Sequence, residues 1–154
     1  PIVTFFEALD ILGKSHNQFD LDPQDEVKLC EYAKENLGSE FIFVEKFPGL
    51  KRPFYAMDSK DDPKLAESFD LLFRGLEITT GGQRIHDLAE LEKKMERYNM
   101  KPEDVGSYTD IFRYGMPPHG GLGIGMERLV MKLLDLQNIR QASLFPRDLN
   151  HLDP

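Results

Sequence analysis

Three glycines alternate with apolar residues in residues 121–129, and this short stretch constrains the fold more than any other. Glycine at Gly121, Gly123 and Gly125 lets the backbone lie flat against a ligand, because no Cβ intrudes. A helical pattern follows at once, with apolar positions at Met126, Leu129, Val130, Leu133 and Leu134. Arg128 falls off this stripe, so it is available to stack on a base or bind a phosphate. The alternative is that the glycines serve only turns and close packing.

The composition is that of a single globular domain. The chain has 154 residues, 40% hydrophobic and 30% charged, which is ordinary for a globular protein and enough for a core. No apolar run reaches transmembrane length, and the N-terminus lacks a signal-peptide pattern, so no membrane association is expected. The one cysteine, Cys30, excludes an internal disulfide. We expect a buried thiol and an intracellular, reducing, cytoplasmic location.

The net charge of −8 bears on nucleic-acid binding. A domain that binds tRNA through its phosphates is expected to carry a basic face. The sequence offers only the pair Lys93 and Lys94, which is interpreted as part of a solvated helix face. If the chain belongs to a tRNA enzyme, its main tRNA-binding part is therefore expected elsewhere.

Apolar periodicity and capping residues predict several helices. Asp22 and Asp87 are N-cap residues, and Gly38 ends the helix that Asp22 begins. The apolar stripes are Val27, Cys30, Ala33 and Leu37 in one helix and Leu88, Leu91, Met95 and Tyr98 in the other. The remaining predicted helices cover residues 4–12, 108–114 and the stretch after Gly125.

Extended segments are predicted at residues 41–44, 68–73 and 76–80, besides the glycine-rich stretch. Arg74 and Gly75 separate the second and third segments, which indicates an antiparallel hairpin. These elements predict an α+β fold with an antiparallel sheet flanked by helices, formed by residues 1–154 as one domain.

The arms of this hairpin carry two carboxylates, Asp70 and Glu77. Depending on register, they face each other on one side of the sheet, where they repel unless a cation or proton lies between them. Two acids and a hydroxyl such as that of Thr80 suit Mg²⁺. The alternative, slightly favoured by spacing alone, is an exposed sheet face decorated with acids.

Arg84 follows a glycine pair near a predicted strand end. Such a pair permits a bulge or a close approach that points the guanidinium into a cleft, where it is a natural partner for a small carboxylate. The alternative is a surface or structural salt bridge. His86 is interpreted mainly as a helix-capping or core residue. No zinc spacing and no nucleophile with a partnered base stand out in the sequence.

These segments together resemble the aspartyl-tRNA synthetase branch of the class II synthetases, in its archaeal and eukaryotic form. The glycine strand with Arg128 resembles motif 3 of that class. The matching segments are residues 68–73, 75–78, 81–86, 114–121, 139–140 and 144–148, in family order. The resemblance covers essentially the whole chain.

The resemblance implies a role for each candidate residue. Asp70, Glu77 and Thr80 would hold Mg²⁺ on ATP, although many family members have Ser where Thr80 stands. Arg84 would bind the side-chain carboxylate of aspartate. The ATP-binding residues would be Glu77, Gly123, Gly125 and Arg128, and Arg128 would also be the catalytic residue. The implied reaction forms aspartyl-adenylate and pyrophosphate from aspartate and ATP.

The resemblance also implies what is missing. Motif 1, motif 2 with its phosphate-binding arginine, and the anticodon-binding domain are absent, because Pro1 corresponds to the segment just after motif 2. The chain is therefore expected to be the C-terminal part of a class II catalytic core, as a truncated paralogue or a fragment. We expect it to be weakly active or inactive alone, with tRNA a partner only within a complete synthetase.

Two other functions stay open from the sequence. One is an asparagine synthetase of synthetase descent, which would use aspartyl-adenylate with ammonia. The other is a non-catalytic binding module that pairs with a full-length synthetase, and a homodimer is also possible. Asparagine specificity is less favoured, because residues 82–86 resemble the aspartate branch.

Overall fold

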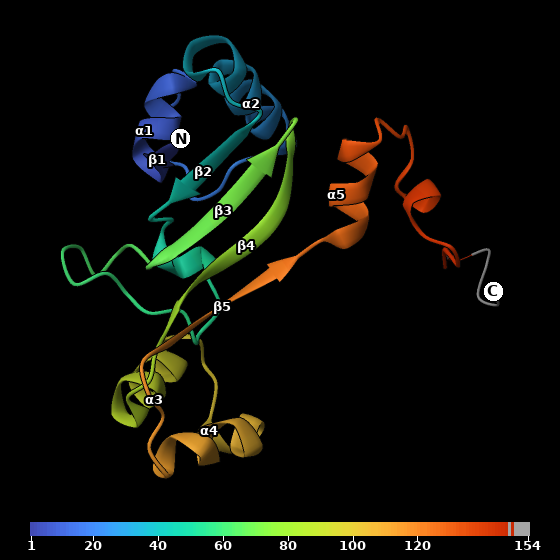
Figure 1. The fold of residues 1–154 in the computed structure, drawn as a ribbon. Coiled ribbons are helices and arrows are strands. Elements are labelled where there is room, and N and C mark those ends of the chain that lie inside the picture. The colour runs from blue at the N-terminus through green and yellow to red at the C-terminus, as the bar shows by residue number, and fades with distance from the viewer. Residues whose placement is uncertain (148, 150–154) are drawn as a thin grey trace.

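The computed structural model describes residues 1–147 and 149; Asp148, which belongs to the last matching segment, lies outside them. Five strands form one sheet in the order β1-β2-β3-β4-β5, and helices cluster at its two ends (Figure 1). The strands are β1 (Ile2–Thr4), β2 (Phe41–Glu45), β3 (Ser68–Phe73), β4 (Leu76–Arg84) and β5 (His119–Ile124). The α-helices are α1 (Phe5–Ile11), α2 (Pro23–Leu37), α3 (Leu88–Arg97), α4 (Gly106–Arg113) and α5 (Met126–Leu133). Short 3-10 helices are η1 (Gly49–Lys51), η2 (Pro102–Val105) and η3 (Ile139–Ala142).

The predicted α+β class is confirmed, with one difference in the sheet. Strands β2 to β5 pair antiparallel, but β1 pairs parallel to β2. Three residues are too few to show alternation, so β1 was not predicted from the pattern.

One core lies between α1, α2 and the face of β2 and β3 that carries Ile42 and Leu72. Thr4 caps α1 and Asp22 caps α2, each in a reciprocal capping box. The stripe predicted for α2 is partly wrong, because Val27 and Leu37 are exposed. The buried positions on that helix are Asp25, Leu29, Cys30 and Ala33. The face that meets the sheet is thus rotated relative to the predicted one. Cys30 is buried as expected, and burial raises the pKa of its thiol.

A second core lies at the other end of the sheet, under α3 and α4 (Figure 1). Leu91 and Met95 of α3 are fully buried in it, as their spacing predicts. The expectation that Lys93 and Lys94 both face solvent is wrong. Lys93 is exposed, but Lys94 is only 2% exposed. Its ammonium donates to the carbonyl of Ala56 and to the Asp58 carboxylate, which compensate its charge.

The hairpin between β3 and β4 forms at Arg74 and Gly75, as predicted. Their φ angles are 46° and 80°, and positive φ at both turn residues matches the twist of a two-residue hairpin. Strand β4 continues past the predicted end at residue 80 to Arg84. It does so because β5 pairs along it and Ala56 forms a further bridge to Arg84.

Helix α5 lies beyond the end of β5, away from both cores (Figure 1). Among the described residues, none of its side chains is buried, and the apolar Met126 and Leu133 are exposed. The stripe that predicted this helix is therefore only partly covered by the described part of the chain, with Leu129 and Val130 half-buried. No helix of the described residues is both long and apolar enough to cross a bilayer.

The contrast between Lys94 and Lys93 gives a test of the second core. Lys94→Met leaves the Ala56 carbonyl and one Asp58 oxygen without their donor, although Arg97 still pairs with Asp58. We expect a loss of about 2 kcal/mol in the free energy of unfolding. Lys93→Met, next to it and exposed, should change this value by no more than about 0.5 kcal/mol. Urea denaturation of both variants measures the difference; equal effects would contradict the buried role.

Candidate functional site

The glycines of β4 and β5 form an open floor on one face of the sheet. Gly82 pairs with Gly121 and Thr80 pairs with Gly123, so these positions lie side by side. A Cβ at Gly82 would lie 2.5 Å from the carbonyl oxygen of Glu67, which excludes any side chain there. Nothing lies within 4 Å of a Cβ at Gly123, so the space above it is open. A cavity of about 280 Å³ stands over this floor.

Arg84 lies at one end of the floor. Strand alternation places it on the same face as Thr80 and Gly82. Its guanidinium lies 4.7 Å from the centre of the Tyr55 ring and packs over Gly121, where a Cβ would come within 2.9 Å of Nη2. Among the described residues, no carboxylate forms an ion pair with Arg84. The arrangement therefore presents a planar cation that is free to bind a carboxylate.

Tyr108 of α4 supports the same guanidinium from another side. Burial raises the pKa of its hydroxyl, while the positive charge of Arg84 opposes that shift. Its ring packs against Tyr55 and Phe112. The loop that carries Tyr55 is joined to β4 by hydrogen bonds from Ile85 N–H to the Tyr55 carbonyl and from Met57 N–H to the Gln83 carbonyl. The second core thus fixes the wall behind Arg84.

Asp70 and Thr80 lie opposite each other at the middle of the floor, in register between β3 and β4. The Thr80 hydroxyl donates to Asp70 Oδ1 over 2.6 Å. Arg52, from the loop after η1, donates to both oxygens of Asp70 over 3.0 and 2.7 Å. It also donates to Thr80 Oγ over 3.1 Å. The structure therefore brings Asp70 and Thr80 together, with the Arg52 guanidinium bonded to both.

Glu77 reaches this face because β4 is irregular. It lies three residues before Thr80, a spacing that places two residues on opposite faces of a regular strand. The pairing shifts between Leu71 and Leu72, so Ile78 becomes an extra residue and Glu77 pairs with Leu72. Glu77 then lies on the same face of the sheet as Leu72 and Asp70. It pairs with Leu72, however, and so does not stand directly opposite Asp70.

Glu77 and Glu26 of α2 share a crowded acidic environment. The backbone N–H of Glu77 donates to Glu26 Oε2 over 2.8 Å. Partial burial raises the pKa of Glu77, Asp70 adds to that rise, and the Arg128 charge opposes it. Burial also raises the pKa of Glu26. A positive charge brought to this corner would be favoured by both carboxylates.

Arg128 is held at the Glu77 end of the floor. Its Nη1 donates to the Glu77 carbonyl over 2.8 Å and lies 3.7 Å from the Glu77 carboxylate. The N–H of Gly125 donates to the Ile78 carbonyl, which fixes the start of α5. The Arg128 stem packs on Gly125, where a Cβ would come within 3.2 Å of it. About half of the Arg128 side chain stays exposed, so it is open to a ligand.

The described residues do not present a ready magnesium site. Their oxygen atoms are the ligands that Mg²⁺ prefers. However, both oxygens of Asp70 and the oxygen of Thr80 already accept from Arg52. No group of three or more His, Cys, Asp or Glu side chains suited to a metal ion occurs in the described ranges. Metal binding by Asp70, Glu77 and Thr80 together therefore stays a prediction. The arrangement of these side chains does not fit it, because Arg52 occupies two of the three proposed ligands.

Sequence reasoning missed Arg52, Tyr55, Tyr108 and Glu26 as members of this site. Arg52 and Tyr55 come from an irregular loop without periodicity, and Glu26 belongs to a distant helix. Only the tertiary structure brings them to the glycine floor. A ring nitrogen of His119 contacts the Pro117 carbonyl oxygen.

The arrangement agrees with the comparison with known proteins. Residues 1–149 match the family model of the class II tRNA synthetases (D, K and N). The chain belongs to this family. The predicted resemblance is thereby confirmed, while the role of each site residue stays a prediction.

Class II synthetases that load aspartate or asparagine are similar over the whole chain. The aspartate–tRNA(Asp/Asn) ligase of Thermus thermophilus is 52% identical over 100% of the chain. The aspartyl-tRNA synthetase structure from Entamoeba histolytica has a TM-score of 0.93 and 41% identity over 99% of the chain. Asparaginyl-tRNA synthetase from Pyrococcus horikoshii, complexed with asparaginyl-adenylate, has a TM-score of 0.88 and 34% identity over 100% of it. The chain spans 37%, 32% and 36% of these three proteins, about a third of each.

The raised pKa of Glu77 gives a pH-dependent prediction. A carboxyl group whose folded pKa exceeds its unfolded value binds more protons when folded, so the free energy of unfolding falls as the pH rises through the folded pKa. Glu77→Gln removes this loss. The variant should therefore gain stability relative to the original chain between pH 4 and pH 7. Urea denaturation at both pH values measures the gain.

Glu31→Gln is the matched control, because Glu31 is an exposed residue of the same type on α2. Its effect should be nearly the same at both pH values. If Glu77→Gln behaves in the same way, burial of the Glu77 carboxyl has no energetic consequence.

Proposed function

We propose that the chain forms the C-terminal half of a class II aspartyl-tRNA synthetase catalytic core. Residues 1–154 would contribute the aspartate-binding and part of the ATP-binding surface of an adenylate-forming site. The observation that supports this proposal is the glycine floor, with unpaired Arg84 at one end and half-exposed Arg128 at the other.

The chemistry of this site would be positioning and charge neutralisation. An oxygen of the aspartate α-carboxylate attacks the α-phosphorus of ATP, forming an O–P bond while the bond to the β-phosphate breaks and pyrophosphate leaves. Arg84 would hold the side-chain carboxylate in a bidentate pair. Arg128 would bind the nucleotide above Gly123 and Gly125 and stabilise negative charge in the transition state. No covalent protein intermediate is needed.

ATP brings magnesium in this family, and the resemblance implies Asp70, Glu77 and Thr80 as its ligands, but the arrangement of these three residues does not fit a metal ion held by all of them. Arg52 already bonds Asp70 and Thr80, and its guanidinium occupies the oxygen lone pairs that a metal ion would need. Within the described part of the site, the arginines supply the positive charge.

Aspartate is favoured over asparagine as the substrate. Arg84 is half-buried and has no acidic partner among the described residues, so an uncharged amide would leave its positive charge uncompensated, whereas a carboxylate would not. Transfer to tRNA would require a complete synthetase. The exposed apolar positions of α5 support contact with the rest of such an enzyme, or with a second copy in a homodimer. The free thiol supports a cytoplasmic location.

A pair of glycine substitutions tests the aspartate site. A methyl group at Gly121 would displace the end of the Arg84 side chain, a flexible group, so the fold should survive. Gly121→Ala should therefore weaken aspartate binding about tenfold or more, measured by saturation-transfer NMR at millimolar ligand. Gly123→Ala, where the added methyl meets nothing within 4 Å, is the control and should bind aspartate as before. Equal binding by both variants would contradict the role of Arg84.

An exchange assay tests the predicted lack of activity. The chain alone should bind ATP weakly and show little or no aspartate-dependent pyrophosphate exchange, because motif 2 is not among its matched segments. Exchange at the rate of a complete synthetase would contradict this proposal. Exchange or product formation that depends on ammonia would instead favour an asparagine synthetase, and the absence of any ATP binding would favour a binding module.

A further inference from the structure

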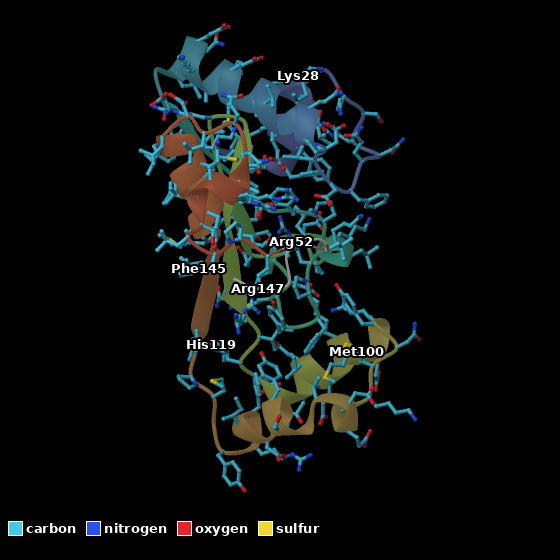
Figure 2. The ribbon with its side chains drawn as sticks, turned by 90° about the vertical axis from the view of Figure 1, so that its right-hand side faces the viewer. Lys28, Arg52, Met100, His119, Phe145 and Arg147 are labelled. Carbon is cyan, nitrogen blue, oxygen red and sulfur yellow. The ribbon has the colours of Figure 1, made fainter. Side chains whose placement is uncertain are left out.

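Arg52 forms the most extensively bonded ion pair of the candidate site. It lies at mid-height of the molecule, between the helices at the two ends of the sheet (Figure 2). Its two terminal nitrogens bond the two oxygens of Asp70, and one of them also bonds Thr80. The side chains of Arg52 and Asp70 are only 13% and 10% exposed. Solvent screening therefore weakens this pair far less than a surface ion pair.

The guanidinium is also fixed from behind. It lies 3.9 Å from the centre of the Phe47 ring, which belongs to the first core. The Tyr98 hydroxyl is bonded to the carbonyl oxygens of Gly49 and Arg52 over 2.8 and 2.6 Å. The first core and the C-terminal end of α3 thus hold the loop that presents Arg52. The cation is therefore pre-organised. Moving the guanidinium away from Asp70 would break its contacts with Asp70, Thr80 and the Phe47 ring.

This geometry conflicts with a metal ion at the same carboxylate. A divalent ion at Asp70 would need oxygen lone pairs that now accept hydrogen bonds from Arg52 and Thr80. It would also lie against a guanidinium, and the two positive charges would repel. The carboxylate of Glu77 is different, because its nearest cation, Arg128, is 3.7 Å away and half-exposed.

We propose that Arg52 is the cation that neutralises Asp70 in this chain and positions Asp70 beside Thr80, which lines the cavity. A divalent ion that binds the chain is held through Glu77, and Asp70 is accessible to it only when Arg52 leaves. The proposal deepens the proposed function, since it concerns the same cavity. It does not require that ATP or aspartate bind.

Manganese titration of the full chain, without nucleotide or amino acid, tests the proposal. Free Mn²⁺ is measured by electron paramagnetic resonance. Arg52→Met should bind Mn²⁺ about ten- to a hundredfold more tightly than the original chain, because it frees the carboxylate of Asp70. Arg113→Met is the control, since it removes the same charge from an exposed position on α4 and should change Mn²⁺ affinity little. Adding Asp70→Asn to Arg52→Met should abolish the gain.

Unchanged affinity in a folded Arg52→Met variant would overturn the proposal, as would loss of Mn²⁺ binding when Asp70→Asn is introduced alone. If Arg52→Met does not fold, an NMR titration of the original chain tests the proposal instead. The Nε–H signal of Arg52, assigned by its absence in Arg52→Lys, should keep its chemical shift in ¹⁵N NMR spectra during titration with Mg²⁺. A shift to the position of a solvent-exposed arginine would mean that the metal displaces Arg52. Failure of aspartate or ATP to bind would contradict the proposed function and leave these outcomes unaffected.

Discussion

The pairing of β3, β4 and β5 is the constraint on which the candidate site depends. Because side chains alternate along each strand, the register Asp70–Thr80 and Gly82–Gly121 places an acid, a hydroxyl and two bare backbone positions on one face. A shift by one residue would turn all of them to the other face. The same register carries Arg84 to the end of the cavity. The site therefore depends first on the register of the sheet, which decides which side chains share one face.

The irregularity at Ile78 adds a second constraint. It turns Glu77 to the face of Asp70, close to Glu26 and Arg128, but pairs Glu77 with Leu72, so the two carboxylates do not stand directly opposite each other. The two carboxylates then meet different cations. Arg52 bonds Asp70 in a largely buried pair, and Arg128 approaches Glu77 in a half-exposed one. Similar acidic side chains on one face of the sheet therefore have different capacities for binding a further cation.

The two cores supply the rigid support that such a site needs. The first core holds the Phe47 ring behind Arg52, and the second holds Tyr55 and Tyr108 around Arg84. Buried Lys94 extends this support by bonding the loop beside Tyr55 through the Ala56 carbonyl. Arg52 and Arg84 are therefore supported by aromatic residues that lie outside the matching segments that mark the family.

The sequence by itself determined the elements whose signals are local. Asp22 and Gly38 delimit α2, Arg74 and Gly75 form the hairpin, and the alternating glycines mark β5, because capping, turn and strand preferences act over a few residues. The motifs also identified the family and singled out Arg84 and Arg128 as candidate site residues, whose roles stay predictions. Tertiary structure alone decided which residues meet. Whether Lys94 is buried, whether Glu77 opposes Asp70, and which cation reaches Asp70 depend on strand register and loop packing. Those contacts join residues far apart in the chain, and no local pattern records them.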